Sequence, residues 1–299
     1  MPFHKPDNII ELPVDENNTL LNFLFQKFPD RSKTTVKSFL RNDQVKVGNS
    51  ITSQFDFQLR QGDKVLVNTS RQWQSLKNPR LKIIFEDEHI IVVYKGYGLL
   101  SMGAKKNGHA RPIESAYSIL REYIKGVNPA QKIFIVHRLD QHTSGLMVFA
   151  KSEEAKNRLQ HNWNNMVLER KYLAVVEGRP QQKSGVQQSY LAENSKFVVY
   201  SSEKPFDGAK LAVTRWRLIR AKGQYSLLEV TLDTGRKNQI RVHLKDMGLP
   251  IVGDKKYGAK TSPIHRLALH AATLRFVHPI TQKDMNFSSP APEPFNKLV

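Results

Sequence analysis

The stretch HRLDQHTSGLMVFAKS, residues 137–152, has the composition of an active-site loop followed by a buried strand. Its carboxylate, Asp140, stands two residues after Arg138. The Thr-Ser-Gly sequence that ends at Gly145 predicts a tight polar turn with close backbone approach at the glycine. The next five residues are apolar, so we expect Asp140 at the edge of a dry pocket, where a carboxylate needs a nearby cation to stay ionised. The alternative is a surface ion pair between Arg138 and Asp140, which would contribute little.

A second stretch, GRKNQIRVHL, supplies the cations that such a carboxylate needs. The sequence predicts a helix here that ends at Gly248. We expect Arg241 on this helix to pair with Asp140, because a charge-assisted hydrogen bond would keep the carboxylate ionised and oriented. Arg236, at the start of the same stretch, is expected to bind phosphate.

The sequence lacks the patterns of several other kinds of site. It contains no cysteine, which excludes disulfides, thiolate catalysis and cysteine-ligated zinc. The ten histidines form no HExxH motif, and His265, His270 and His278 are interpreted as structural or phosphate-facing. Neither a P-loop nor a GxSxG motif occurs, and a glycosidase would need a second opposed carboxylate. We therefore expect no metal and no cofactor.

The charge balance indicates a polyanionic partner. Lysine and arginine number 46 against 27 aspartates and glutamates, a formal net charge of +19. Nucleic acid is the commonest partner of so basic a chain, although the charge would also suit a solubilising surface on an enzyme with a small substrate. Because no apolar run approaches ~20 residues and no targeting signal is apparent, we expect a cytoplasmic protein without membrane association.

Residues 1–69 predict a small N-terminal α/β domain. Apolar residues between Leu20 and Phe28 fall near helical spacing, and a second helix should open at Ser32 or Lys33, before short strands. The second helix and its flank carry basic side chains that we expect to contact RNA: Arg31, Lys33, Lys37 and Arg41. Residues 70–82 hold four basic residues, no acidic ones and a proline, and are interpreted as a linker.

Residues 83–299 predict an α+β domain built on a mixed, mostly antiparallel sheet with few helices. Strand patterns recur at KIFIVH, GLMVFAKS, KYLAVVEG, LAVTRWRLI, YSLLEVTL and ALHAATLRFVHP. The segment RPIESAYSILREYI predicts a helix with Pro112 in its first turn. The candidate active-site loop therefore lies between predicted strands, and the candidate arginines lie on a helix later in the chain.

Four motifs in this region, in order along the chain, resemble those of the RluA-type pseudouridine synthases. HRLDQHTSGL resembles the family signature, and KYLAVVEG (residues 171–178) resembles its tyrosine-bearing strand. GRKNQIRVHLKDMGLPIVGDKKYG (235–258) is similar to its third motif, and HRLALHAATLRFVHP (265–279) to its C-terminal strand. Residues 19–67 resemble the alpha-L RNA-binding domain, the type found in ribosomal protein S-four, which often precedes the catalytic domain in this family.

The resemblance implies an isomerase that converts uridine to pseudouridine in structured RNA without a cofactor. It assigns Asp140 as nucleophile or general base at the sugar, and both roles stay open. Arg241 would hold Asp140 ionised, and Tyr172 would stack on the uracil and relay a proton. The RNA-binding residues expected in this domain are Arg138, Arg236 and Gln239.

By the same resemblance, Arg138 would fill the space that the flipped uridine leaves. An N-terminal alpha-L domain in this family favours large-subunit ribosomal RNA as substrate, with transfer RNA as the alternative. A non-catalytic RNA-binding factor in ribosome assembly is the second hypothesis, and the intact catalytic residues argue against it. The family usually has histidine where this chain has Asn238, and Lys-Pro where it has Lys95-Gly96. Nothing in the sequence requires more than a monomer.

Overall fold

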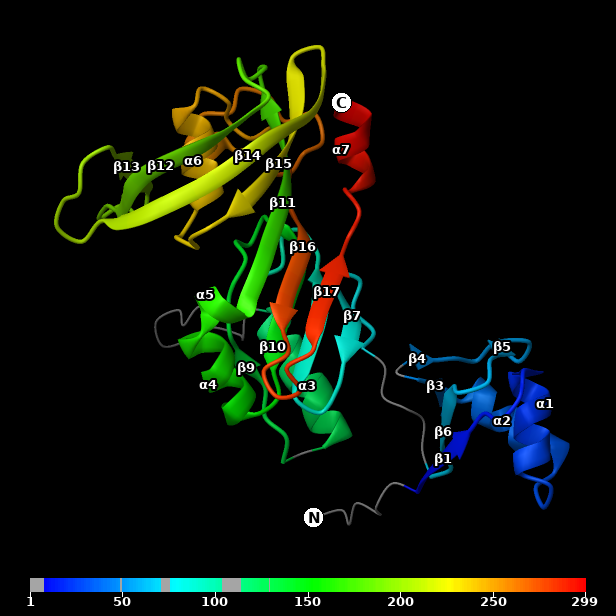
Figure 1. Ribbon diagram of the computed structural model, residues 1–299. Coiled ribbons are helices and arrows are strands. Elements are labelled where there is room, and N and C mark those ends of the chain that lie inside the picture. Colours follow the sequence, from blue (N-terminus) through cyan, green and yellow to red (C-terminus); the bar gives the residue numbers. More distant parts are fainter. Residues whose placement is uncertain (1–7, 49, 71–75, 104–113, 129) are drawn as a thin grey trace. The chain divides into compact units, whose positions relative to one another are not determined.

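The computed structural model describes residues 8–48, 50–70, 76–103, 114–128 and 130–299. The chain divides into two compact units, Met1–Lys77 and Asn78–Val299 (Figure 1). The expected linker, residues 70–82, is too long at its C-terminal end, because a strand of the second unit begins at Leu81. Its central part, residues 71–75, lies outside the described residues.

The first unit combines a pair of helices with short antiparallel strands. In chain order its elements are β1 (Ile9–Pro13), β2 (Asn18–Thr19), α1 (Leu20–Lys27), α2 (Lys33–Arg41), β3 (Val45–Val47), β4 (Ser50–Ile51), β5 (Gln58–Leu59) and β6 (Lys64–Asn68). Four of the strands form a sheet in the order β1-β6-β3-β4, and β2 pairs with β5. The predicted helices and short strands are therefore present.

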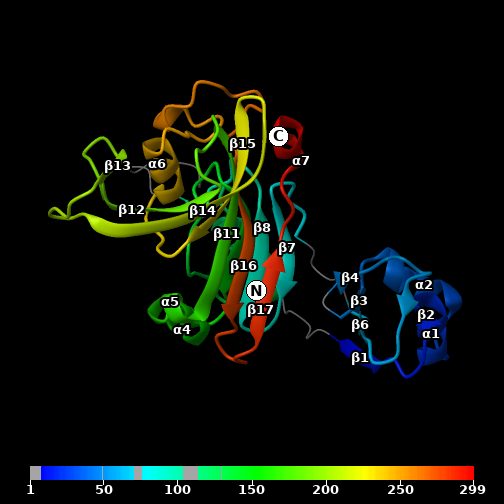
Figure 2. The same ribbon diagram turned by 45° about the horizontal axis from the view of Figure 1, so that its top comes forward.

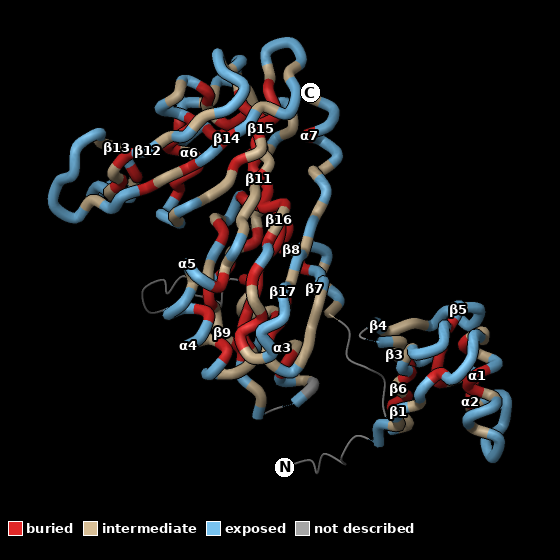
Figure 3. Tube along the Cα trace, in the orientation of Figure 1, coloured by how far each residue is buried: buried red, intermediate tan, exposed pale blue. Residues whose placement is uncertain are grey.

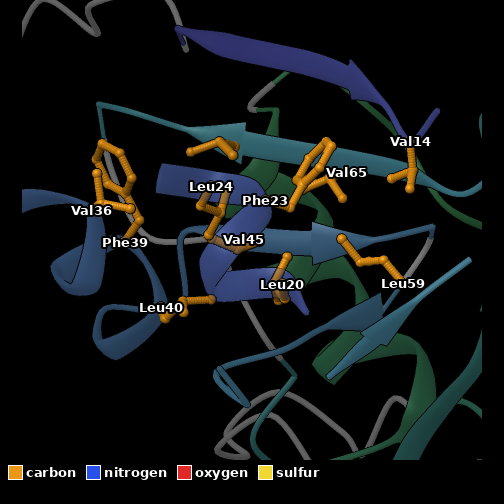
Figure 4. Packing of buried hydrophobic residues seen from close by; sticks show 11 residues of the cluster. Val14, Leu20, Phe23, Leu24, Val36, Phe39, Leu40, Val45, Leu59 and Val65 are labelled. Atoms are coloured by element: carbon orange, nitrogen blue, oxygen red, sulfur yellow. The ribbon is translucent and has the colours of Figure 1, made fainter. Parts of the chain in front are cut away.

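Apolar side chains of α1 and α2 fill the space against these strands and form the core of the unit (Figure 4). Ser32 caps α2, since its hydroxyl accepts a hydrogen bond from the backbone N–H of Thr35. The helix consequently starts at Lys33, one of the two predicted positions. The basic side chains of Lys33, Lys37 and Arg41 follow one another at four-residue spacing, so they lie along one stripe of the helix, and all are exposed, as is Arg31.

The second unit is built on one long sheet. In chain order its elements are β7 (Leu81–Glu86), β8 (Ile90–Lys95), α3 (Ala116–Val127), β9 (Phe134–Ile135), β10 (Ser144–Ala150), α4 (Glu153–His161), α5 (Trp163–Met166), β11 (Val167–Glu177), β12 (Ser184–Glu193), β13 (Val199–Ser202), β14 (Lys210–Lys222), β15 (Tyr225–Leu232), α6 (Gln239–Asp246), η1 (Lys255–Tyr257), β16 (Leu269–Val277), β17 (Asp284–Ser288) and α7 (Glu293–Leu298).

The strands of this sheet follow the order β13-β12-β14-β15-β11-β16-β10-β8-β7, with β17 paired to β16 and β9 to β10. All pairings are antiparallel except that of β10 with β16, which is parallel. The predicted mixed, mostly antiparallel sheet is thus confirmed. β11 and β16 lie at its centre, and the β12–β15 end is turned strongly relative to the β7–β10 end (Figures 1 and 2).

Each end of the sheet is covered by its own helices. α6 packs against the β12–β14 end, and α4 packs against β9 and β10 at the other. Every residue of β10 is buried, because the strand lies between β8 and β16 and under α4 (Figure 3). The continuous apolar run after Gly145 therefore reflects a central strand covered on both faces.

Three local boundaries differ from the predictions. α3 begins at Ala116 with Ser115 as its cap, and Pro112, expected in its first turn, lies outside the described residues. The Thr-Ser-Gly sequence is not a turn, since β10 already starts at Ser144 and the turn lies before it. α6 ends at Asp246, close to the predicted end, and Gly248 follows with a positive φ of 71°.

The expected close approach at Gly145 is confirmed. This residue has φ of 122° and pairs with Ala271 across the parallel ladder. A Cβ atom built on it would lie 2.2 Å from the carbonyl oxygen of Ala271. Because this oxygen belongs to the backbone, no change of rotamer can remove the clash. A side chain at this position would therefore separate β10 from β16 at the start of the strand that follows the Asp140 loop.

We expect Gly145→Ala to destabilise the second unit by about 3 kcal/mol or more, through overpacking and backbone strain together. The matched control is Gly223→Ala, which also has a positive φ, 56°, but no atom within 4 Å of the added Cβ; it should cost only roughly 1 kcal/mol. Chemical denaturation followed by tryptophan fluorescence measures the free energy of unfolding of both variants. Equal losses of stability in the two variants would contradict this explanation.

Candidate active site

The loop that carries Asp140 joins β9 to β10 and is held rigidly by the segment after β8. The hydroxyl of Ser101 donates to the carbonyl of Leu139 at 2.7 Å and accepts from its N–H at 3.1 Å. The N–H of Gly98 donates to the carbonyl of Gln141 at 3.0 Å. These contacts fix the backbone on both sides of Asp140, so the direction of the carboxylate does not depend on its own side-chain contacts alone.

Lys95 strengthens the same junction from inside the protein. Its side chain is fully buried, and Nζ donates to the carbonyl oxygens of Gly96, Leu99 and Gln141 at 3.1, 2.8 and 3.2 Å. Burial lowers the pKa of Lys95 to about 7, while the nearby Asp140 carboxylate raises it. The sequence does not indicate this role, because a lysine at the end of a strand is usually solvated.

Gly96, where the family usually has proline, has a structural reason in this chain. Its N–H donates to the carbonyl oxygen of Arg80 at 2.6 Å, and a Cβ atom would lie 2.9 Å from the same oxygen. Proline has no N–H to donate. The departure from Lys-Pro is therefore explained by the way the backbone packs before β7.

Arg241 lies between two carboxylates. Its Nη1 is 3.5 Å from Oδ2 of Asp140, and Nε and Nη2 each donate to Asp254 at 2.7 Å. Asp254 is almost fully buried, with 1% of its side chain exposed, whereas 27% of the Asp140 side chain is exposed. The guanidinium is thus locked by Asp254 and presents its remaining face to Asp140, with the ring of Tyr257 4.7 Å away. The expected contact of Arg241 with Asp140 is present, and the bidentate pair with Asp254 is new.

Asn238 gives Asp140 a second partner. In the amide orientation that satisfies both neighbours, Nδ2 donates to Oδ2 of Asp140 at 2.9 Å and Oδ1 accepts from the hydroxyl of Tyr257 at 2.8 Å. The residue caps α6 in the left-handed conformation, with φ of 52°, which asparagine tolerates better than most residues. The family's histidine is thus replaced by a neutral donor that contacts the candidate catalytic carboxylate directly.

Tyr172, on β11, lines the same pocket as Asp140. The side chain is buried, with 9% exposed, and burial raises the pKa of its hydroxyl, an effect that Asp140 reinforces and Arg170 opposes. The hydroxyl therefore stays protonated at neutral pH. His137, by contrast, is neutral, because burial and the charge of Arg170 lower its pKa to about 3, and its Nε2 accepts from the N–H of Val148 at 3.1 Å.

The pocket itself has a volume of about 370 Å³, within the range of small-ligand sites. Its wall includes the catalytic candidates Asp140, Tyr172 and Arg241. The expected RNA-binding residues Arg138 and Arg236 also line it, and both are exposed. The surface ion pair of Arg138 with Asp140 is not formed in the described part of the chain, where Asp140 pairs with Arg241.

Gln239 is placed differently from the expectation. It is 2% exposed, and Nε2 donates to the carbonyl of Val213 at 3.0 Å and to the hydroxyl of Thr214 at 2.9 Å. Its Oε1 accepts from the hydroxyl of Thr234 at 2.8 Å and from the N–H of Arg236 at 2.9 Å. Since all hydrogen-bonding groups of the amide are used inside the protein, the prediction of an RNA contact is not supported, and Gln239 instead ties α6 to β14.

Of the three histidines interpreted as structural or phosphate-facing, His265 is exposed and the other two are buried. His270 is buried, and its Nδ1 lies 2.9 Å from the hydroxyl of Ser144. His278 is also buried, and its Nε2 is 3.0 Å from Asp87. Across the described ranges, no group of three or more histidine, aspartate or glutamate side chains is placed to bind a metal ion. No described helix has the length and apolar character that a membrane crossing requires.

The pocket and its supports therefore include residues for which the sequence predicts no site role: Asp254, Tyr257, Lys95, Arg170 and Trp163. The sequence gives a hint of Asp254, because this residue lies inside the third motif. Its pairing with Arg241, however, depends on the turn after α6. The sequence also gives a hint of Arg170, because this residue precedes Tyr172 by two positions and so lies on the same face of the strand. The basic side chains expected to bind RNA on α2 and its flank belong to the first unit.

Known proteins resemble this chain along most of its length. Residues 89–246 match the family model of RNA pseudouridylate synthases. An uncharacterised RNA pseudouridine synthase of Bacillus subtilis is 33% identical over 281 residues, covering 93% of this chain and 91% of its own. The ribosomal large subunit pseudouridine synthase D of Escherichia coli is 29% identical over 296 residues, covering 92% and 88% of the two chains.

The solved structure of human RNA pseudouridylate synthase domain containing 4 shares the fold of the second unit. It has a TM-score of 0.57 and 24% identity, and the match covers 72% of this chain and 90% of that one. The family model spans both the Asp140 loop and Arg241. The chain therefore belongs to the RluA-type RNA pseudouridine synthases, isomerases that act on RNA.

Proposed function

We propose that this protein converts uridine to pseudouridine in large-subunit ribosomal RNA, with Asp140 as the catalytic carboxylate. One observation carries the assignment to Asp140: its carboxylate is held between Arg241 and Asn238 at the wall of a pocket that also contains Tyr172. The ribosomal substrate is supported by the relatives named as large-subunit enzymes. Transfer RNA is the alternative substrate.

The reaction exchanges one glycosidic bond for another. The bond between carbon 1′ of the sugar and nitrogen 1 of the uracil breaks, the base turns, and a new bond forms between carbon 1′ and carbon 5. A proton leaves carbon 5 and another is taken up at nitrogen 1, so no atom is gained or lost. Asp140 would either attack carbon 1′ and be displaced when carbon 5 bonds there, or remove the proton from carbon 2′ and return it as the new bond forms. Either role needs the ionised carboxylate.

The surroundings of Asp140 suit this requirement. Burial opposes the charge of Arg241, but Asp254, Asp140 and Tyr257 together raise its pKa, so Arg241 stays charged. Asn238 donates a hydrogen bond that does not titrate. Tyr172 offers a buried ring on which uracil can stack and a protonated hydroxyl that can relay the carbon 5 proton. The target base must be flipped out of the RNA to reach this pocket.

The test is a map of pseudouridines in all RNAs from cells with and without this gene, by sequencing after chemical adduct formation. We expect sites in large-subunit ribosomal RNA to disappear when the gene is absent. Loss of sites only in transfer RNA would keep the chemistry and overturn the proposed substrate. If no site changed, the non-catalytic RNA-binding hypothesis would replace the proposal.

Asn238→Asp should shift the pH dependence of turnover. The new carboxylate would face Asp140 at hydrogen-bonding distance, and two such carboxyl groups tend to share a proton. We therefore expect the acid limb of the kcat profile to move to higher pH by ~2 units, with recovery of turnover in mild base. The control is Asn194→Asp, on an exposed loop. A profile that coincides with the wild type would show that Asn238 does not contact the reacting carboxylate.

Removal of residues 1–77 should weaken RNA binding but preserve the chemistry. The second unit contains its own sheet, core and site, whereas the exposed basic stripe of α2 belongs to the first. A second RNA-binding module raises avidity by about 10²-fold or more, so we expect a loss of that order in apparent affinity and little change in rate at saturating RNA. Full affinity and selectivity in the truncated chain would show that the first unit is not a targeting module.

A further inference from the structure

We propose that Arg170, together with Arg236 and Arg138, forms a subsite for an RNA phosphate adjacent to the flipped uridine. This inference deepens the proposed function and rests on it. The ligand class is a phosphodiester of single-stranded RNA. Neither the motifs nor the comparisons assign a role to Arg170, which lies two residues before Tyr172 on β11.

The first argument is the charge of the pocket wall. Of the residues that the structure describes, four arginines and a single carboxylate, Asp140, line the pocket. Arg241 pairs with Asp140 and Asp254. Among the described residues, no carboxylate lies within salt-bridge distance of Arg138, Arg170 or Arg236. The charge of Asp233 acts on Arg170 from farther away, but that carboxylate pairs with Arg215. Such an arrangement attracts an anion.

The second argument is how firmly Arg170 is held. Nη2 donates to the carbonyl of Leu232 at 3.2 Å, and the guanidinium lies 5.8 Å from the centre of the Trp163 ring. A Cβ atom on Gly235 would lie 2.7 Å from Nη1, so the glycine leaves the space that the guanidinium occupies. Trp163 is in turn packed against His137, with ring centres 4.9 Å apart. A mobile surface arginine would need none of these contacts.

The third argument is the cost of this placement. Arg170 is half-buried, and burial lowers its pKa more than Tyr172 and Asp233 raise it, so the folded protein holds the charge in a place that disfavours it. Its neighbour His137 is neutral and adds no counter-charge. A bound phosphate would supply a close counter-charge and the acceptors for the remaining N–H groups of the guanidinium.

The position of Arg170 fits a phosphate next to the target nucleotide. Residues two apart on a strand share a face and lie ~7 Å from each other, so Arg170 is displaced from Tyr172 along β11 by a distance comparable to the span of a nucleotide. With uracil stacked on Tyr172, the phosphate backbone would leave the pocket past Arg170. Arg236 and Arg138, both exposed at the same pocket, would approach it from outside.

The experiment measures binding of a short oligouridylate to the full chain, with Asp140→Asn as the common background so that turnover does not intervene. Arg170→Gln keeps a side chain able to donate to Leu232 but removes the charge, and Arg170→Lys keeps the charge. The matched control is Arg217→Gln, an exposed residue paired with Glu229 in the same unit. The salt dependence of Kd is measured for each. A second series replaces one phosphate of the oligomer at a time with neutral methylphosphonate.

We expect Arg170→Gln to weaken binding by roughly tenfold or more and to reduce the slope of log K against log salt by about 0.7. Arg170→Lys should retain the slope, and Arg217→Gln should change neither quantity. One methylphosphonate position should weaken binding to the wild-type Arg170 protein but not to Arg170→Gln. That pattern supports the subsite even if the chain forms no pseudouridine, in which case only the proposed function fails.

Two results would overturn the subsite. The first is an unchanged salt slope in Arg170→Gln. The second is an equal loss of affinity in Arg170→Gln and Arg170→Lys, with no dependence on any methylphosphonate position. This result would arise if Arg170 only supported the structure through Leu232 and Trp163.

Discussion

Asp140→Asn is expected to lower pseudouridine formation by at least about 10⁴-fold, the scale seen when a group that reacts directly is removed, while RNA binding persists. The amide has nearly the same shape but can neither attack the sugar nor remove its proton. Folding should be unaffected, because Arg241 keeps its bidentate partner Asp254. Single-turnover assays and RNA titrations measure the two quantities separately.

The control for this variant is Asp284→Asn, which removes a carboxylate from an exposed ion pair with Arg275 on the same sheet. It should react at the wild-type rate. Product formation by Asp140→Asn at a rate near the wild type would refute the assignment of Asp140. Loss of RNA binding together with turnover would show instead that the carboxylate supports the shape of the pocket.

Arg241→Leu is expected to reduce turnover strongly and also to destabilise the second unit. The substitution removes the cation beside Asp140 and leaves the buried Asp254 without its bidentate partner, which costs about 3–5 kcal/mol for a broken buried pair. Turnover and the free energy of unfolding are measured on the same preparation. Unchanged kinetics would remove Arg241 from the mechanism.

A double variant separates the two effects. Adding Asp254→Asn to Arg241→Leu replaces the isolated buried charge with a neutral amide, so much of the lost stability should return. Turnover should stay low, because Asp140 still lacks its cation. If turnover recovered together with stability, Arg241 would be a structural residue only. Arg241→Lys, which keeps the charge without the planar fork, should retain part of the rate.

The contact between Asp140 and Arg241, 101 residues apart, could be predicted because both lie in strong local motifs. The partner that fixes Arg241 could not, since the pairing with Asp254 depends on how the turn before η1 packs under α6. Gln239 shows the converse. It stands between motif arginines in the sequence, yet its amide is used to join α6 to β14, and no local pattern reveals that burial.

For the fold too, the sequence predicts the local elements but not every long-range pairing. Alternating and continuous apolar runs indicate strands, and the mixed, mostly antiparallel sheet follows from their number and spacing. The parallel pairing of β10 with β16 brings together segments far apart in the chain, and only the glycine at position 145 hints at it. The predicted linker, residues 70–82, overlaps β7 by two residues, because its basic composition continues into that strand without a break.

The most direct test of the central claim uses purified protein and large-subunit ribosomal RNA transcribed in vitro, which contains no pseudouridine at the start. The RNA is incubated with the wild-type chain and with Asp140→Asn, without added cofactor, and pseudouridines are then mapped. We predict pseudouridine at a limited set of positions with the wild type and none with Asp140→Asn. Absence of pseudouridine with both, or equal amounts with both, would contradict the claim that Asp140 in this pocket isomerises uridine.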